Sequence, residues 1–182
     1  MTATRLLILG VLRARQPAHG YEVRRELETW GAGEWANIAY GSIYHALKKM
    51  AEEGLLEPVD TDGAEGRPAR ISYGVTGRGE EEFQSLLREY WWKQKPIVDP
   101  FQVALAFMQQ MPREELLAAL RHRADSYRSA AREYTEYGVR EKTRAGAPRH
   151  VVENLRLAAA QSEAAATWAE EAIARVERGD LP

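Results

Sequence analysis

Apolar residues near the start of the chain recur at helical spacing and predict two helices. An almost unbroken apolar run over 6–12 is typical of a buried helix, which Thr4 caps and which ends before Pro17. A second helix starts after Gly20, with apolar residues three and four positions apart on one face. The glycine-containing stretch 31–34 then breaks it.

A third helix follows and carries the most complete set of signals. Ser42 is a preferred residue type for its N-cap, and Gly54 is placed to end it. One apolar stripe faces the core and consists of Ile43, Ala46, Leu47 and Met50. The opposite side is polar, which predicts that this helix lies at the surface of its domain.

Alternating side chains predict a β-hairpin after the third helix. An apolar stretch over 55–59 precedes a turn-rich segment over 60–68, and residues 71–75 then alternate between apolar and polar. Thr76 is suited to cap a fourth helix that reaches Trp92. The first half therefore has the order helix, helix, helix, hairpin, helix.

A domain boundary is predicted in the segment 93–100. Its two prolines fix their own backbone angles and restrict the residues before them. We expect a first domain over 1–95 and a helical second domain over 96–182. Three helices are predicted in the second domain, over 101–111, over 114–137 and from Pro148 onwards.

The last helix contains a stripe of apolar and small residues whose steps alternate between three and four. The stripe consists of Val152, Leu155, Ala159, Ser162, Ala166, Ala169, Ile173 and Val176. This is the spacing of a coiled-coil seam, and the small residues at its centre allow a close approach. We expect it to form the interface of a homodimer. The alternative is a bundle helix packed within its own chain.

Composition limits the possible chemistry. Hydrophobic residues make up 45% of the 182 residues and charged residues 29%, so the chain can form a core. The absence of cysteine excludes disulfides, cysteine zinc sites and thiol nucleophiles. The longest apolar run is much shorter than the roughly 20 residues that span a bilayer. We expect a soluble, cytoplasmic protein without a membrane partner.

Charge is balanced along the chain. The net charge is −2, with 13 Lys and Arg against 14 Asp and Glu over 1–95, and 12 against 13 over the remainder. Neither half is basic enough to bind nucleic acid through bulk charge. Binding to double-stranded DNA must therefore depend on local placement of cations.

The order of elements is that of a winged helix-turn-helix, whose third helix enters the major groove of DNA. The predicted fold is mainly α, with a small β-hairpin wing and a C-terminal α-helical, coiled-coil-like dimerisation domain. Residues 40–49 include no acid, and the candidate DNA-binding residues among them are Tyr40, Ser42, Tyr44, His45, Lys48 and Lys49. Arg67 and Arg70 are the candidates in the wing. For the two lysines, the alternative is a solvated helix face.

Four motifs resemble the PadR family of bacterial transcriptional regulators. They are His-Gly-Tyr-Glu-Val at 19–23, Gly-Ser-Ile-Tyr-His-Ala-Leu-Lys-Lys-Met at 41–50, Glu-Gly-Leu-Leu at 53–56 and Tyr-Gly-Val-Thr-Gly-Arg-Gly at 73–79. The second half resembles longer PadR proteins in length and helical pattern. The resemblance implies a homodimeric repressor that binds a palindromic operator and is released by a small effector.

The resemblance also assigns roles to single positions. Ser42 and Tyr44 fall on the motif of the recognition helix, Tyr21 on the Gly-Tyr of the second helix, and Arg67 in the wing. Tyr21 and Tyr44 have an alternative role as core aromatics. His45 stands where many members have proline, so this chain gains a backbone donor and a side chain that can contact DNA.

Aromatic residues suggest a site for an effector. Five tryptophans and eight tyrosines are a large supply of rings, and domain junctions favour small-molecule pockets. A planar hydrophobic ligand is the expected effector, although the pattern assigns no lining residues. The alternative for these rings is ordinary packing in the core or at an interface.

Other classes of function have weaker support in the sequence. The four histidines stand far apart, and neither a zinc-protease motif, a nucleophile elbow nor a phosphate-binding loop is present. We expect no catalytic residues, no metal and no cofactor, hence no enzyme. A winged helix used for protein interaction, without sequence-specific DNA binding, is the other alternative. Salt-dependent binding to duplex DNA separates it from the regulator.

Overall fold

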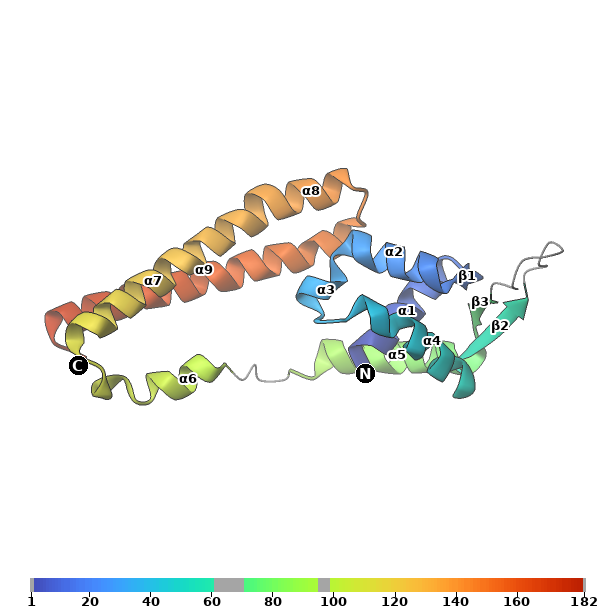
Figure 1. Cartoon of the computed structure of the whole chain (residues 1–182), viewed down its shortest axis with the longest axis horizontal. Coiled ribbons are helices and arrows are strands. Elements are labelled where there is room, and N and C mark those ends of the chain that lie inside the picture. Colours follow the sequence, from blue (N-terminus) through green and yellow to red (C-terminus); the bar gives the residue numbers. More distant parts are fainter. Residues whose placement is uncertain (1, 61–70, 95–98, 182) are drawn as a thin grey trace. The chain divides into compact units, whose positions relative to one another are not determined.

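The structure of the chain is a computed structural model that describes residues 2–60, 71–94 and 99–181 (Figure 1). The chain forms two compact units, Met1–Lys95 and Pro96–Pro182. Helices predominate in both units. Within the described part of the chain, every helix is too short or too polar to cross a membrane.

The first unit contains five helices, a 3-10 turn and three strands in its described residues. In chain order these are α1 (Thr2–Ala14), β1 (Ala18–His19), α2 (Gly20–Trp30), α3 (Ala32–Trp35), the 3-10 turn η1 (Tyr40–Ser42), α4 (Ile43–Glu52), β2 (Leu56–Asp60), β3 (Ile71–Val75) and α5 (Gly77–Trp92). The predicted cap at Thr4 is wrong because α1 begins two residues earlier. The break after α2 is real, but Gly31 leads into the short helix α3.

The sheet has the antiparallel order β1-β3-β2. The predicted hairpin is β2 paired with β3, with Leu56 opposite Val75 and Val59 opposite Ser72. Strand β1 joins the other edge of β3 through Ala18 and was not predicted. It has only two residues, which is too short to show an alternating pattern.

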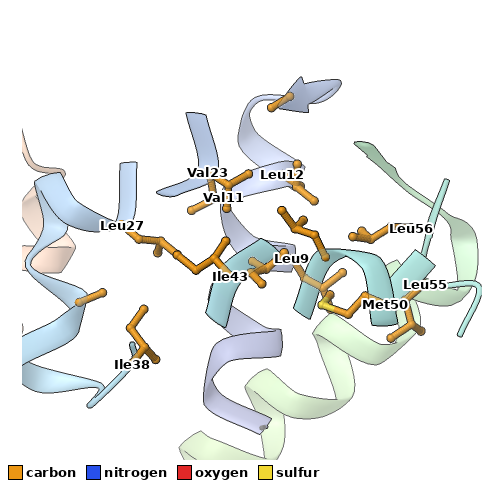
Figure 2. Close-up of a cluster of buried hydrophobic side chains, with 14 residues drawn as sticks. Leu9, Val11, Leu12, Val23, Leu27, Ile38, Ile43, Met50, Leu55 and Leu56 are labelled. Carbon is orange, nitrogen blue, oxygen red and sulfur yellow. The ribbon is translucent and has the colours of Figure 1, made fainter. Parts of the chain in front are cut away.

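One hydrophobic cluster holds the first unit together (Figure 2). Helix α1 contacts α2, α4, α5 and β3, which explains why it is apolar on nearly all sides. Its side chains meet those of α2 and α4, and Leu9, Leu27 and Ile43 have no exposed surface. This cluster fixes α4 by its apolar face and leaves its polar face at the surface.

Local capping sets the ends of α4 and α5. Gly54 has a φ of +73°, the left-handed conformation with which helices commonly end. The Thr76 hydroxyl accepts a hydrogen bond from the Gly79 amide at 3.0 Å, so the predicted cap of α5 is confirmed. A Cβ at Gly79 would lie 2.1 Å from the Leu55 carbonyl oxygen, so α5 packs against this backbone only with glycine there.

The second unit is helical throughout its described residues. It consists of α6 (Pro100–Leu105), the 3-10 turn η2 (Met108–Gln110), α7 (Arg113–Arg132), the π-helical turn η3 (Glu133–Gly138), α8 (Val139–Arg144) and α9 (Arg149–Arg178). The helix predicted over 101–111 is shorter, because α6 stops at Leu105. The helix predicted over 114–137 is longer, because η3 joins α7 to α8.

Helices α7 and α9 lie side by side and antiparallel, which corrects the expectation of a subunit interface along the stripe of α9. Arg113 at the start of α7 bonds the Val176 carbonyl at the end of α9. Helix α7 is the main partner of α9, and the stripe is buried inside the single chain at Val152, Leu155, Ala159, Ala166, Ala169 and Val176. Ser162 and Ile173 are half-buried. The alternative of a helix packed within its own chain therefore describes this stripe.

Candidate DNA-binding surface

Helix α4 presents two opposite faces, one buried and one exposed. Ile43 and Leu47 are at most 1% exposed and anchor the helix in the core. Tyr44, His45 and Lys48 lie on the other side of the helix and are exposed. The predicted recognition helix therefore exists with its polar face outward, as a helix that enters a groove requires.

The start of α4 is built differently from the prediction. Ser42 occupies the N-cap position, but its hydroxyl donates to the Ala39 carbonyl at 2.7 Å and does not cap the helix amides. Tyr40 is half-buried and its hydroxyl serves the fold, while its role as a DNA contact stays a prediction. Its hydroxyl accepts from the Gly33 amide at 2.9 Å and donates to the Leu27 carbonyl at 3.4 Å.

Tyr21 and Tyr44 lie at the surface, which excludes their alternative role as core aromatics. Each is 47% exposed, and the Tyr21 ring stacks on His19 with centroids 5.5 Å apart. They share an open hollow of about 660 Å³, lined also by Ile71 and Tyr73 of β3. The start of α2, the exposed face of α4 and one strand of the hairpin thus meet on one surface.

Gly20 permits the close approach of α2 to Tyr44. A Cβ at this position would lie 2.9 Å from the Tyr44 Cε1 and 3.1 Å from the Leu47 Cδ1. Any larger residue at Gly20 must therefore displace the ring of Tyr44. This contact accounts for glycine before Tyr21 and links the two tyrosine-bearing segments.

Arg24 is a basic residue of this surface that the sequence analysis missed. It is exposed on α2, and its Nε donates to Glu28 Oε1 at 2.7 Å. This hydrogen bond and the charge of Glu28 raise the pKa of Arg24, and the Tyr44 hydroxyl acts in the same direction. Its position three residues after Tyr21, on one face of α2, was the signal available in the sequence.

The two lysines of α4 are exposed but face carboxylates one turn away. Lys48 Nζ is 3.9 Å from Glu52 Oε1, and Lys49 Nζ is 4.0 Å from Glu53 Oε1. The Lys48 side chain is 77% exposed and that of Lys49 is 50% exposed. Exposed pairs of this kind contribute only about 0–1 kcal/mol, so a phosphate can replace the carboxylate at modest cost.

The predicted wing residues Arg67 and Arg70 lie outside the described residues, which end at Asp60 on one side and resume at Ile71 on the other. Within the described ranges, no cluster of histidine and acidic residues could hold a metal ion.

A cavity of about 320 Å³ opens beside α4 and is lined in part by Ile38, Ala46 and Met50.

The aromatic side chains, whose number suggested an effector site, have different surroundings. Trp30 and Trp35 pack against the core of the first unit. Trp91 and Trp92 at the end of α5 are 80% and 84% exposed. In the second unit, Phe101 packs edge-on against Trp168.

The chain is similar in fold to three solved structures. Bacillus subtilis PadR in complex with p-coumaric acid matches with a TM-score of 0.72 at 19% identity, covering 96% of this chain and 99% of that one. The same protein in complex with operator DNA matches with a TM-score of 0.69 at 20% identity, and the match covers 97% of this chain and 98% of that one. The Vibrio cholerae virulence activator AphA matches at 0.66 and 21%, covering 96% and 98%.

Sequence comparison shows a likeness between the first unit and one family. No curated protein matches the chain at the level of sequence. The family model of the transcriptional regulator PadR-like family matches residues 8–85, which include α2, α4, the hairpin strands and most of α5. Within this region, the chain is similar to the PadR-like family of transcriptional regulators.

Proposed function

We propose that the chain is a repressor that binds a palindromic operator as a homodimer. The observation that carries this proposal is the exposed polar face of α4, where Tyr44, His45 and Lys48 lie opposite the buried side chains of the apolar stripe. An α-helix held in this way fits the major groove, which is about 12 Å wide. The Bacillus subtilis PadR structure with operator DNA supports the same use of the fold.

The residues of this surface have separate roles in the proposed complex. Lys48 and Lys49 contact phosphates, which position the protein on DNA and make binding depend on salt. Tyr44, His45 and Ser42 lie where base edges are read. Tyr21 and Arg24 at the start of α2, with Arg67 and Arg70 in the wing, contact the adjacent backbone.

The second unit is proposed to join two copies, so that residues 1–95 bind DNA and 96–182 dimerise. Because α7 already covers the stripe of α9, the interface must use other apolar surface. Val103, Phe107 and Leu157 are 63%, 61% and 58% exposed, which is the surface that a second copy would cover. Two recognition helices then engage half-sites about 34–36 Å apart.

Introducing negative charges into this apolar surface tests the dimer. Phe107→Asp combined with Leu157→Asp should shift the protein to monomer in sedimentation. Trp91→Asp, at a ring of the first unit that is 80% exposed, should leave the dimer intact. A dimer that survives the double substitution would contradict the assignment of this surface.

A small aromatic effector is proposed to release the operator. Its support is the Bacillus subtilis PadR complex with p-coumaric acid. Such a ligand acts only if it binds one arrangement of the two recognition helices better than the other. Titration with phenolic acids should displace labelled DNA and change tryptophan fluorescence, whereas no displacement across a broad set would contradict effector control.

The DNA-binding proposal is tested by the salt dependence of binding. Lys48→Ala with Lys49→Ala should weaken binding to duplex DNA and lower the slope of log affinity against log salt by about 2, one for each phosphate contact. Lys93→Ala is a matched control, because Lys93 is also exposed and faces Glu89 one turn away at 3.8 Å. An unchanged slope in the double variant would exclude these phosphate contacts.

The second candidate function is a winged helix that binds only proteins. The side-chain ion pairs of Lys48 and Lys49 favour it, because they reduce the positive charge of α4. This candidate predicts no salt-dependent affinity of the wild-type chain for duplex DNA. The titration described above therefore separates the two functions.

A further inference from the structure

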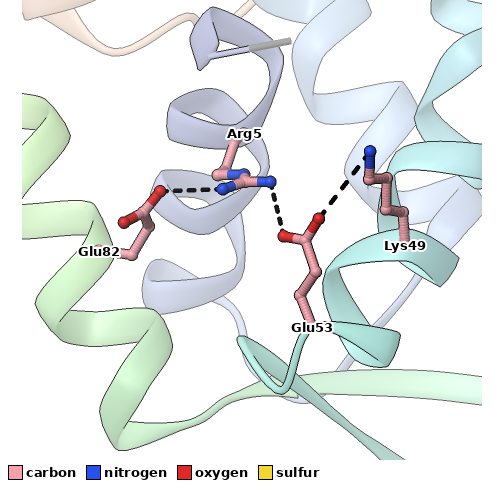
Figure 3. A network of polar contacts seen from close by, with 4 residues as sticks. All are labelled: Arg5, Lys49, Glu53 and Glu82. Atoms are coloured by element: carbon pink, nitrogen blue, oxygen red, sulfur yellow. Dashed lines mark hydrogen bonds and ion pairs between the residues drawn. The ribbon is translucent and has the colours of Figure 1, made fainter.

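An arginine of α1 bridges two acidic residues at the end of α4 and on α5 (Figure 3). Arg5 Nη2 donates to Glu53 Oε2 at 2.6 Å, and Arg5 Nη1 donates to Glu82 Oε1 at 3.0 Å. The Arg5 side chain is 25% exposed and that of Glu53 is 32% exposed. One guanidinium therefore holds two carboxylates from different helices in a half-buried position.

The same Glu53 also faces a lysine of the recognition helix. Its second carboxylate oxygen, Oε1, lies 4.0 Å from Lys49 Nζ, so the acid stands between two cations (Figure 3). Lys48 has a simpler environment. It faces Glu52 at 3.9 Å, and in the described part of the chain Glu52 forms an ion pair with this lysine alone.

We propose that Arg5 is a positioning residue that sets the charge of the DNA-binding face of α4. By holding Glu53 against α1, it limits how far Glu53 neutralises Lys49. Lys49 can then exchange this carboxylate for a phosphate at a lower cost. This inference rests on the proposed function and adds a residue that lies outside α4 and has no part in reading DNA itself.

The geometry favours Arg5 over Lys49 as the partner of Glu53. Coulomb attraction varies inversely with distance, and it is screened less at the half-buried Arg5 than at the exposed Lys49. Arginine stays charged at all physiological pH values, and its planar fork can hold two carboxylates at once. Glu82 fixes the other side of the fork, so that Arg5 remains pointed at the end of α4.

A double-mutant cycle tests the proposal on the full chain, with a labelled mixed-sequence duplex as the probe. Arg5→Gln should weaken binding roughly two- to fivefold, the effect expected of one exposed charge interaction. It should also lower the salt slope by up to about 1, because the contribution of one phosphate contact is weakened. Adding Glu53→Gln should restore both values, and Glu53→Gln should increase affinity more in the Arg5→Gln background than in the wild type.

Glu52→Gln is the matched control for Glu53→Gln, since it removes an acid one residue away that Arg5 does not contact. Glu52→Gln should increase the affinity for DNA by the same factor in the wild type and in the Arg5→Gln background. Glu82→Gln should weaken DNA binding less than Arg5→Gln does, because Arg5 loses one of the two carboxylates that position it but keeps its bond to Glu53. Arg5→Lys, which retains the charge, should keep most of the wild-type affinity.

A purely structural role of Arg5 gives a different pattern. If Arg5 only stabilises α1 against α4 and α5, then Arg5→Gln with Glu53→Gln stays as weak as Arg5→Gln alone. That result, or equal effects of Glu53→Gln in both backgrounds, would overturn the proposal while the wild-type chain still binds DNA. Loss of salt-dependent binding in the wild type itself would instead overturn the proposed function and this inference together.

Discussion

The two units of this chain bury their apolar residues in different ways. The first unit collects large aliphatic side chains from helices and strands into one cluster, in which α1 is covered on several sides. The second unit pairs two long helices along a stripe whose centre is alanine. The buried residues of its described cluster are Leu116, Leu117, Leu120, Ala172 and Val176. A broad core holds a helix from several sides, whereas in a narrow pair of helices each helix is held along a single stripe.

Truncation in the broad core should have the largest effect on stability. Leu47 is 1% exposed and joins α4 to the cluster. Leu47→Ala should lower the free energy of unfolding by about 2–5 kcal/mol, measured by urea denaturation. Gln161→Ala in the second unit is the control, because this side chain is exposed on α9. Equal losses for the two variants would erase the difference between the units.

Enlargement of the alanine stripe should have a smaller effect. Ala166 has no exposed surface where α9 packs against α7, so Ala166→Leu should cost about 1–3 kcal/mol through overpacking. Ala164→Leu, at an exposed position of the same helix, should change stability little. If Ala166→Leu lowers stability no more than Ala164→Leu does, α7 and α9 are packed more loosely than the burial of Ala166 implies.

The smallest effect concerns one ion pair in each unit. The Arg128 hydrogen bonds to Glu170, both 2.5 Å, lower the pKa of Glu170, and the bond from Arg13 lowers the pKa of Glu80. A carboxyl with a lowered folded pKa contributes stability above its unfolded value of 4.5, and this contribution is lost as the pH falls through the folded value.

Arg128→Gln and Arg13→Gln should therefore each make stability less dependent on pH in the acid range. The effect is expected to be slight, because both pairs are exposed to solvent. Urea denaturation at a series of pH values below about 5 measures it. Variants that lose stability on acidification as steeply as the wild type would show that these pairs contribute nothing to the acid response.

Sequence patterns predicted the elements of the first unit better than their contacts. The alternation of apolar and polar residues over 71–75 predicted the bounds of β3. Ile43, Leu47 and Met50 of the apolar stripe of α4 are buried as expected, and Ala46 is partly buried. The pattern could not predict that Tyr40 turns inward, because its hydroxyl partners Gly33 and Leu27 become neighbours only through folding.

The second unit shows the limit of periodicity more clearly. The heptad-like stripe of α9 indicated correctly which face is buried, but no periodic pattern states which helix covers it. Residues such as Ala166 and Val176 are covered by the same chain because α7 folds back along α9. Likewise, Ser42 has the residue type of a cap but bonds Ala39, since η1 precedes the helix.

The central claim is that the exposed face of α4 lies in a groove of DNA. The chain has no cysteine, so His45→Cys gives a single attachment point for an iron chelate that cleaves nearby DNA. Arg88→Cys, at an exposed position of α5, is the control. The account predicts cleavage at a few discrete nucleotides from position 45 and far less from position 88. No cleavage from position 45, or the same pattern from both positions, would contradict it.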